Sequence, residues 1–140
     1  MKLILLELNE INFDIVREYL NSGEKLDNFK YLIDRNLITT KAEDEYNKIE
    51  PWIQWVSVHT GLSYDDHKVF RLGDIVNHKH EQFFEKIEKS GFKVGAVSPM
   101  NTDNKLKNPA YFIPDPWTKT SSDNSFLSKI LSESISQAVN

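Results

Sequence analysis

The chain has 140 residues, a length that suits one domain with a hydrophobic core. Charged residues make up 27% of it and the net charge is −4, which argues against nucleic acid as the main partner because a phosphate backbone attracts a basic surface. Cysteine is absent, so disulfides, thiolate metal sites and cysteine nucleophiles are excluded. The longest apolar run, Leu3–Leu6, is too short for a signal peptide or a membrane span. These features predict a cytoplasmic protein.

The first segment predicts a strand that ends in a polar cluster. Lys2–Leu8 contains a continuous apolar run without helical periodicity, which favours a strand buried on both faces of a parallel sheet. Glu7, Asn9 and Glu10 follow at its carboxyl end, the usual position of a site in an open α/β sheet. Their oxygen atoms suit hard or borderline cations, so they are candidate metal ligands. The alternative is a polar turn that leads into a helix, with Asn12 as the helix cap.

Two helices and a strand are expected next. Apolar residues recur at helical spacing over Phe13–Asn21 and over Lys25–Asn36. The β-branched residues in the centre of Leu37–Ala42 predict a short strand. Residues 43–49 are rich in acidic side chains and precede the helix predicted over Glu50–Gly61.

Glu50–Gly61 predicts a buried helix with an anion-binding tip. Pro51 suits the first helical position and Gly61 suits a helix end. Apolar or aromatic side chains recur through the segment, which favours burial on most sides: Trp52, Ile53, Trp55, Val56, Val58 and His59. A helix N-terminus carries unpaired N–H groups and a partial positive charge, and Glu50 and Gln54 flank this one as candidate catalytic residues. The alternative is a core helix with a carboxylate cap.

The second half of the chain predicts an alternating α/β pattern. A helix over Glu81–Ser90 ends at Gly91, and buried strands are expected over Phe92–Val97 and Ala110–Ile113. His78 and His80 stand where that helix begins, which favours a solvated helix start over a metal pair. Phe126–Val139 predicts a final amphipathic helix without a stop signal, which indicates the front part of a longer protein. The predicted fold is α/β, a mostly parallel sheet with helices on both faces.

Four segments resemble the N-terminal part of the alkaline phosphatase superfamily, which includes phosphodiesterases, sulfatases and phosphoglycerate mutases. Leu3–Asn9 is similar to its apolar strand ending in a metal-binding Asp, and Glu50–Gly61 to the helix that carries its nucleophile and closes with Thr-Gly. Gly61–His67 is similar to its turn with His, and Phe83–Val97 to its helix, Gly and strand. The resemblance implies that residues 1–140 form the N-terminal part of an alkaline-phosphatase-like α/β domain.

The resemblance also implies a chemistry, with two departures. The nucleophile position falls on Pro51, which excludes a covalent intermediate there, and the metal-binding Asp position falls on Asn9. Gln54 stands where the family contacts the phosphate or sulfate. The implied activity is a metal-dependent hydrolase or transferase of phosphate or sulfate esters, on small molecules or glycans. Glu50 or Glu10 would act as base or ligand. The metal would be zinc, manganese, magnesium or calcium. Ligands from a later part of the parent protein would complete its site, so this segment alone need not bind the metal.

Two further readings stay open. A non-catalytic α/β binding or scaffold domain would keep the fold without the chemistry, and Pro51 and Asn9 favour it. A nucleotide-binding domain is disfavoured because no glycine-rich loop follows the first strand. An exposed sheet edge would allow a homodimer. The enzyme reading requires Asn9 and Gln54 to share one solvent-reachable hollow.

Overall fold

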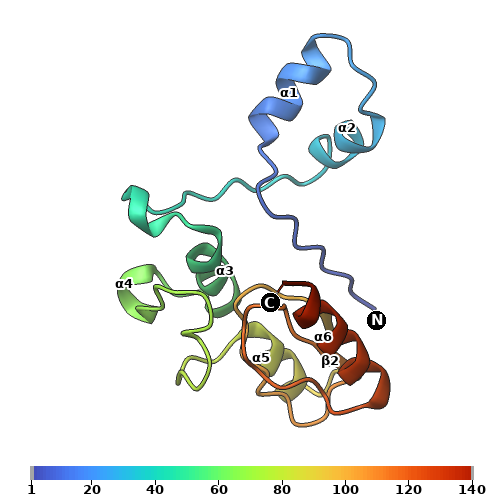
Figure 1. Ribbon diagram of the computed structural model, residues 1–140. Helices are drawn as coiled ribbons and strands as arrows, with labels where there is room; N and C mark the ends of the chain where they lie inside the picture. Colours follow the sequence, from blue (N-terminus) through green and yellow to red (C-terminus); the bar gives the residue numbers. More distant parts are fainter. Residues whose placement is uncertain (1, 140) are drawn as a thin grey trace. The chain divides into compact units, whose positions relative to one another are not determined.

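A computed structural model describes residues 2–139, and the chain is α/β (Figure 1). It divides into two compact units, Met1–Ala42 and Glu43–Asn140. No helix within residues 2–139 combines the length and the apolar character that a membrane crossing requires.

The first unit contains two helices, α1 (Phe13–Asn21) and α2 (Asp27–Ile33). Asn12 caps α1, because its side-chain oxygen accepts the N–H groups of Asp14 at 2.8 Å and Ile15 at 3.3 Å. The bounds predicted for α1 are confirmed, and so is the cap. The second helix is confirmed but is shorter than predicted, because it starts after Leu26, which offers no side-chain cap.

The apolar faces of α1 and α2 are only half-buried. Neither helix contains a fully buried residue. The half-buried apolar residues of the two helices follow the predicted helical spacing: Phe13, Val16, Leu20, Leu26, Phe29 and Ile33.

Both strands predicted in the first unit are wrong. Residues 2–8 and 37–42 form no strand, and Ile4 and Ile38 are 85% and 84% exposed. An apolar run becomes a strand only when another strand satisfies its backbone N–H and C=O groups. No strand among the described residues pairs with either segment.

The second unit holds the remaining elements. In chain order they are η1 (Tyr46–Lys48), α3 (Pro51–Thr60), α4 (Tyr64–His67), α5 (Phe83–Lys89), β1 (Gly95–Val97), β2 (Tyr111–Ile113) and α6 (Phe126–Val139). Gly61 ends α3 in the left-handed conformation, at φ 74°, as its position predicted.

The sheet of the described chain is a pair of parallel strands. Gly95 lies opposite Tyr111, and Ala96 lies opposite Phe112. The Tyr111 ring crosses Gly95 so closely that a Cβ there would lie 2.4 Å from it, which explains why glycine stands at this position. The predicted parallel pairing is therefore confirmed for β1 and β2, whereas the predicted sheet with further strands at residues 2–8 and 37–42 is not confirmed.

Two apolar clusters form the core of the second unit. One joins α5 to the sheet through Phe84, Val94, Ala96 and Phe112. The other joins α3 to the segment after α4 through Val56, Val69 and Ile75. Helix α3 contributes to the core with one face, since Val58 on its other side is exposed. The prediction that α3 is buried on most sides is therefore correct for one face only.

Helix α6 has the predicted bounds but the opposite orientation. Ser128 is 2% exposed whereas Leu127 is 65% exposed, so the apolar stripe faces outward. Asp123 explains this, because its Oδ2 accepts the Ser128 hydroxyl at 2.7 Å and the Phe112 N–H at 2.5 Å. Burial opposes ionisation of Asp123, but the hydrogen bonds from Ser125, Ser128 and Phe112 prevail and lower its pKa to about 2.

Candidate functional site

The first turn of α3 begins at Glu50 and Pro51, as predicted. Glu50 is half-buried with an extended backbone, and its carbonyl accepts the N–H groups of Ile53 at 2.9 Å and Gln54 at 3.0 Å. Its carboxylate makes no capping hydrogen bond, so the expected carboxylate cap is wrong. Pro51 at the first helical position has no N–H to satisfy, which explains why the helix forms there without a cap.

Gln54 is held by the backbone that precedes α3. Its side-chain Nε2 donates to the carbonyl of Lys48 at 2.8 Å. The Lys48 ammonium in turn contacts Glu45 at 2.6 Å and Asp65 at 3.6 Å. Gln54 therefore ties η1 to α3 with one of the two N–H donors of its amide.

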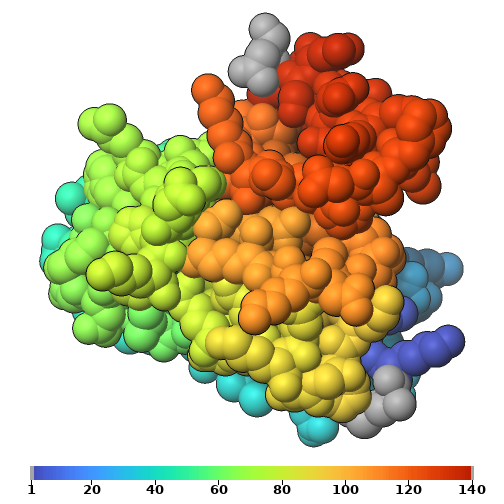
Figure 2. Space-filling view, turned by 90° about the horizontal axis from the view of Figure 1, so that it is seen from below, coloured from blue at the N-terminus to red at the C-terminus, as the bar shows by residue number. Residues whose placement is uncertain are grey.

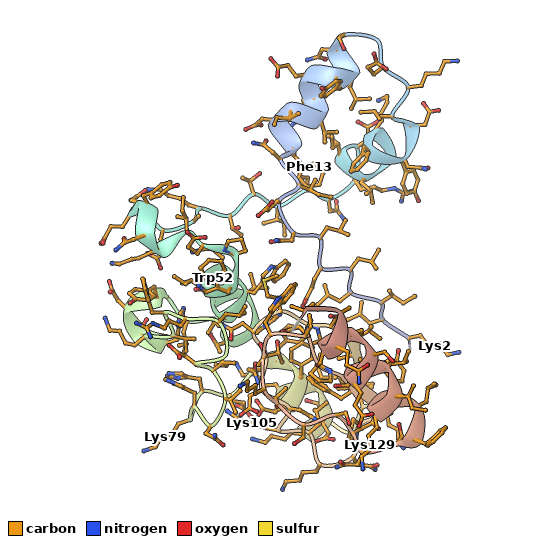
Figure 3. The ribbon with its side chains drawn as sticks, viewed as in Figure 1. Lys2, Phe13, Trp52, Lys79, Lys105 and Lys129 are labelled. Carbon is orange, nitrogen blue, oxygen red and sulfur yellow. The ribbon has the colours of Figure 1, made fainter. Side chains whose placement is uncertain are left out.

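Asn101 joins the loop after β1 to the first turn of α3. The residue is fully buried and left-handed, with φ 49°. Its side-chain oxygen accepts the Gly73 N–H at 2.8 Å, and its Nδ2 donates to the carbonyls of Trp52 at 2.8 Å and Arg71 at 3.4 Å. Its own N–H donates to Asp115 at 2.8 Å. Trp52, labelled in Figure 3, lies one residue beyond the proline that opens α3. The Asn101 side chain thus fixes two segments, Trp52 in α3 and residues 71–73, and its backbone N–H fixes a third at Asp115.

Asp115 organises the loop after β2. Its Oδ1 accepts the N–H groups of Trp117 at 2.8 Å and Thr118 at 2.7 Å. Its Oδ2 accepts the Thr118 hydroxyl at 2.7 Å and the Asn101 N–H. Four donors surround this buried carboxylate, which satisfies its hydrogen-bonding capacity.

Asp103 makes a second connection between the two loops. Its Oδ1 accepts the Thr120 hydroxyl at 2.8 Å, and its Oδ2 accepts the Asn77 N–H at 3.0 Å. Lys105 lies 3.8 Å from the same carboxylate. The loops that follow β1 and β2 are therefore joined to each other at Asp103 and Thr120, and the loop after β1 also contacts α3 through Asn101.

The second unit contains two buried histidines, His59 in the last turn of α3 and His67 at the end of α4. His59 stacks on Trp55 with ring centroids 5.7 Å apart, and its Nδ1 lies 2.9 Å from the Thr102 hydroxyl. It is a core residue of α3.

The hydrogen bonds of His67 define its tautomer. Nδ1 accepts the Val69 N–H at 3.0 Å, so the proton of the neutral ring is on Nε2, which donates to Ser57 Oγ at 3.1 Å. Burial lowers the pKa of His67, and the charge of His80 lowers it further. In this state His67 cannot accept a proton from Ser57, so the pair is not a nucleophile with its base.

The arrangement places the loop after β1 against the first turn of α3 and joins it to the loop after β2. Ligands of open α/β sheets bind beyond the carboxyl ends of the strands, and helix N-termini attract anions. The buried side chains of Asn101, Asp103 and Asp115 form hydrogen bonds with other protein groups, so their role is to hold these loops in place.

The predicted metal ligands lie in the first unit, whereas Glu50 and Gln54 lie in the second. Glu7 is half-buried, Asn9 is exposed, and Glu10 is left-handed with φ 60°. Within residues 2–139, His, Asp and Glu side chains form no group of three that could hold a metal ion. The role of Glu7, Asn9 and Glu10 as metal ligands stays a prediction. The predicted meeting of Asn9 with Gln54 stays a prediction, because each unit is described separately.

Comparison of the chain with protein-family models, with curated proteins and with solved structures found no match.

Asn101 and Asp115 were not singled out by the sequence argument. A signal was present, because Asn101–Asp103 follows the predicted strand Phe92–Val97 just as Asn9 follows the first segment. The rule that sites lie at the carboxyl ends of strands applies to both positions.

Proposed function

We propose that this chain is the N-terminal part of a metal-dependent hydrolase or transferase that acts on phosphate or sulfate esters, with an alkaline-phosphatase-like fold. One observation carries the proposal. Asn101 donates to the Trp52 carbonyl of α3 at 2.8 Å and to the Asp115 carboxylate at 2.8 Å, so the loop after β1 contacts the first turn of α3 and is joined to the loop after β2. This layout supports an oxyanion site at Glu50–Gln54.

The chemistry at this tip excludes a covalent intermediate. Pro51 has no nucleophilic atom, so the attacking group is a water or a substrate hydroxyl, and Glu50 is the candidate base. A carboxylate beside a bound anion repels it unless a proton or cation lies between them. In the whole protein a divalent zinc, manganese, magnesium or calcium ion would neutralise the ester, with ligands beyond those that residues 2–139 supply.

The test uses the whole protein to which this segment belongs. Its metal content is measured by mass spectrometry, and turnover is measured with nitrophenyl phosphate and nitrophenyl sulfate. We expect Glu50→Gln to lower kcat by about 10²-fold or more while the thermal midpoint stays unchanged. Glu133→Gln is the matched control, because it removes an exposed carboxylate of α6. Absence of both bound metal and turnover in the unmodified protein would refute the proposal.

The second candidate is a non-catalytic α/β binding or scaffold domain. Pro51 at the tip and the bond from Gln54 to the Lys48 carbonyl favour it, because both residues then have purely structural roles. Under this candidate Gln54→Ala lowers stability by about 1 kcal/mol and changes nothing else. Loss of activity or metal uptake in Gln54→Ala at an unchanged thermal midpoint would rule this candidate out.

A further inference from the structure

A hollow of about 700 Å³ lies beside α5, away from the first turn of α3. Its walls come from residues 79–81, from α5 and the residues after it, and from residues 105–108. Figure 2 shows the yellow end of α5 and the light orange loop after β1 side by side on one face. The volume is in the range of small-molecule sites, about 300–1,000 Å³.

Five lysines line this hollow, although the chain is acidic overall. They are Lys79, Lys89, Lys93, Lys105 and Lys107. Lys105, labelled in Figure 3 with Lys79, is fixed because its ammonium donates to the carbonyls of His78 and His80 and lies near Asp103.

The carboxylates of the hollow are already engaged. Glu88 accepts the backbone N–H groups of Lys107 at 2.9 Å and Asn108 at 2.7 Å, which lower its pKa. Glu81 pairs with Lys89 at 2.5 Å. Glu85 accepts the N–H of Gln82 at 2.5 Å. These contacts hold the three glutamate side chains against α5 and the neighbouring backbone.

The five lysines outnumber the three glutamates of the hollow, and the excess positive charge is on exposed lysines. Lys79, Lys93 and Lys107 are exposed and form no ion pair within residues 2–139, although the charge of Lys107 helps to lower the pKa of Glu88. Lysines in the last turn of a helix can compensate the helix dipole, which accounts for Lys89. Lys93 and Lys107 lie beyond α5, so that explanation does not extend to them.

An exposed aromatic ring stands beside the lysines. Phe92 is 57% exposed and lines the hollow next to Gly91. A ring beside ammonium groups offers an apolar face to a ligand whose charged groups the lysines attract. The apolar face of a sugar ring could lie on Phe92 while anionic substituents reach the ammonium groups.

We propose that this hollow binds a saccharide that carries two or more phosphate or sulfate groups. The site shares no residue with the helix tip at Glu50–Gln54, so it is independent of the proposed function. Lys93 and Lys107 attract the anionic groups and Phe92 contacts the ring.

The first test is calorimetry on the full chain with sucrose octasulfate at low ionic strength, compared with uncharged sucrose. We expect Lys93→Gln combined with Lys107→Gln to weaken binding at least about tenfold and to reduce its salt dependence. Lys119→Gln combined with Lys129→Gln is the matched control, because it removes two exposed lysines outside the hollow and gives the same net charge. Equal weakening in both double variants, or no binding of sucrose octasulfate, would overturn the proposal.

The second test asks whether the ligand contains a sugar. We expect Phe92→Ala to weaken sucrose octasulfate about fivefold or more and to leave tripolyphosphate binding unchanged, because the inorganic anion has no ring. If Phe92→Ala leaves both affinities unchanged, the hollow takes an inorganic polyanion and the saccharide assignment is wrong. Either failure leaves the ester-turnover test of the proposed function unaffected.

Discussion

Replacing Asn101 with alanine tests whether the buried polar connection stabilises the second unit. The substitution leaves the Gly73 N–H without its partner, and it removes the second hydrogen bond of the Trp52 carbonyl, which also belongs to the ladder of α3; both bonds are 2.8 Å long in the native chain. An orphaned N–H costs about 1–3 kcal/mol and a lost hydrogen bond about 0.5–1.5 kcal/mol. Alanine at φ 49° adds about 1 kcal/mol, because asparagine tolerates the left-handed conformation better. We expect a total loss of about 3–5 kcal/mol in the free energy of unfolding.

The assay is urea unfolding followed by tryptophan fluorescence, since Trp52 and Trp55 both lie on α3. Asn124→Ala is the matched control. Asn124 is also left-handed, with φ 66°, but it is exposed. The control therefore measures the backbone cost alone, for which we expect about 1 kcal/mol.

Asn101→Gly separates the two contributions further, because glycine removes the conformational cost and still lacks the side-chain hydrogen bonds. We expect it to be destabilised by about 1 kcal/mol less than Asn101→Ala, and it serves as the readout if the alanine variant does not fold. Equal losses in Asn101→Ala and Asn124→Ala would refute the reasoning, because the buried hydrogen bonds would then contribute nothing.

Three other predictions concern the stability of the second unit. The pKa of His67 is lowered in the folded chain, so the unfolded chain binds the proton first as the pH falls below 6.5. Stability should therefore decrease below that pH by at most about 1.4 kcal/mol per unit, and urea unfolding of His67→Gln should lack this slope. The pKa of Asp123 is about 2 against an ordinary 3.8, so its contribution is present above pH 3.8 and is lost as the pH falls towards 2. After allowance for solvent screening we expect about 1 kcal/mol, which Asp123→Asn should abolish in an acid titration followed by circular dichroism. Phe112→Ala should cost about 3–5 kcal/mol in thermal unfolding, because the ring is fully buried between α5 and the sheet; a loss below 1 kcal/mol would contradict that placement.

Local signals predicted the helices well. Pro51 and Gly61 mark the ends of α3 through their own backbone preferences, and Asn12 marks the start of α1 through its side chain. Each signal acts within a few residues, so the sequence contains it in readable form. The strands predicted over residues 2–8 and 37–42 failed for the opposite reason, because a strand depends on a partner elsewhere in the chain.

The connections around the candidate site are equally non-local. Asn101 contacts Gly73 across 28 positions and Trp52 across 49 positions. Periodicity could place a strand before Asn101 but could not identify the partners of its side chain. The position of the N-terminus of α3 could be predicted from Pro51. The hydrogen bond from Gln54 to the Lys48 carbonyl could be found only in the three-dimensional structure.

The reversed orientation of α6 affects how the protein behaves in solution. Because Ser128 occupies the inward side, Leu127, Ile130 and Leu131 present a row of hydrocarbon to water. Such a surface binds fluorescent dyes like ANS and gains cohesion in sulfate salts, which strengthen apolar association. Sedimentation of the chain should therefore depend on protein concentration and on the anion of the buffer, and Leu127→Ser should reduce that dependence.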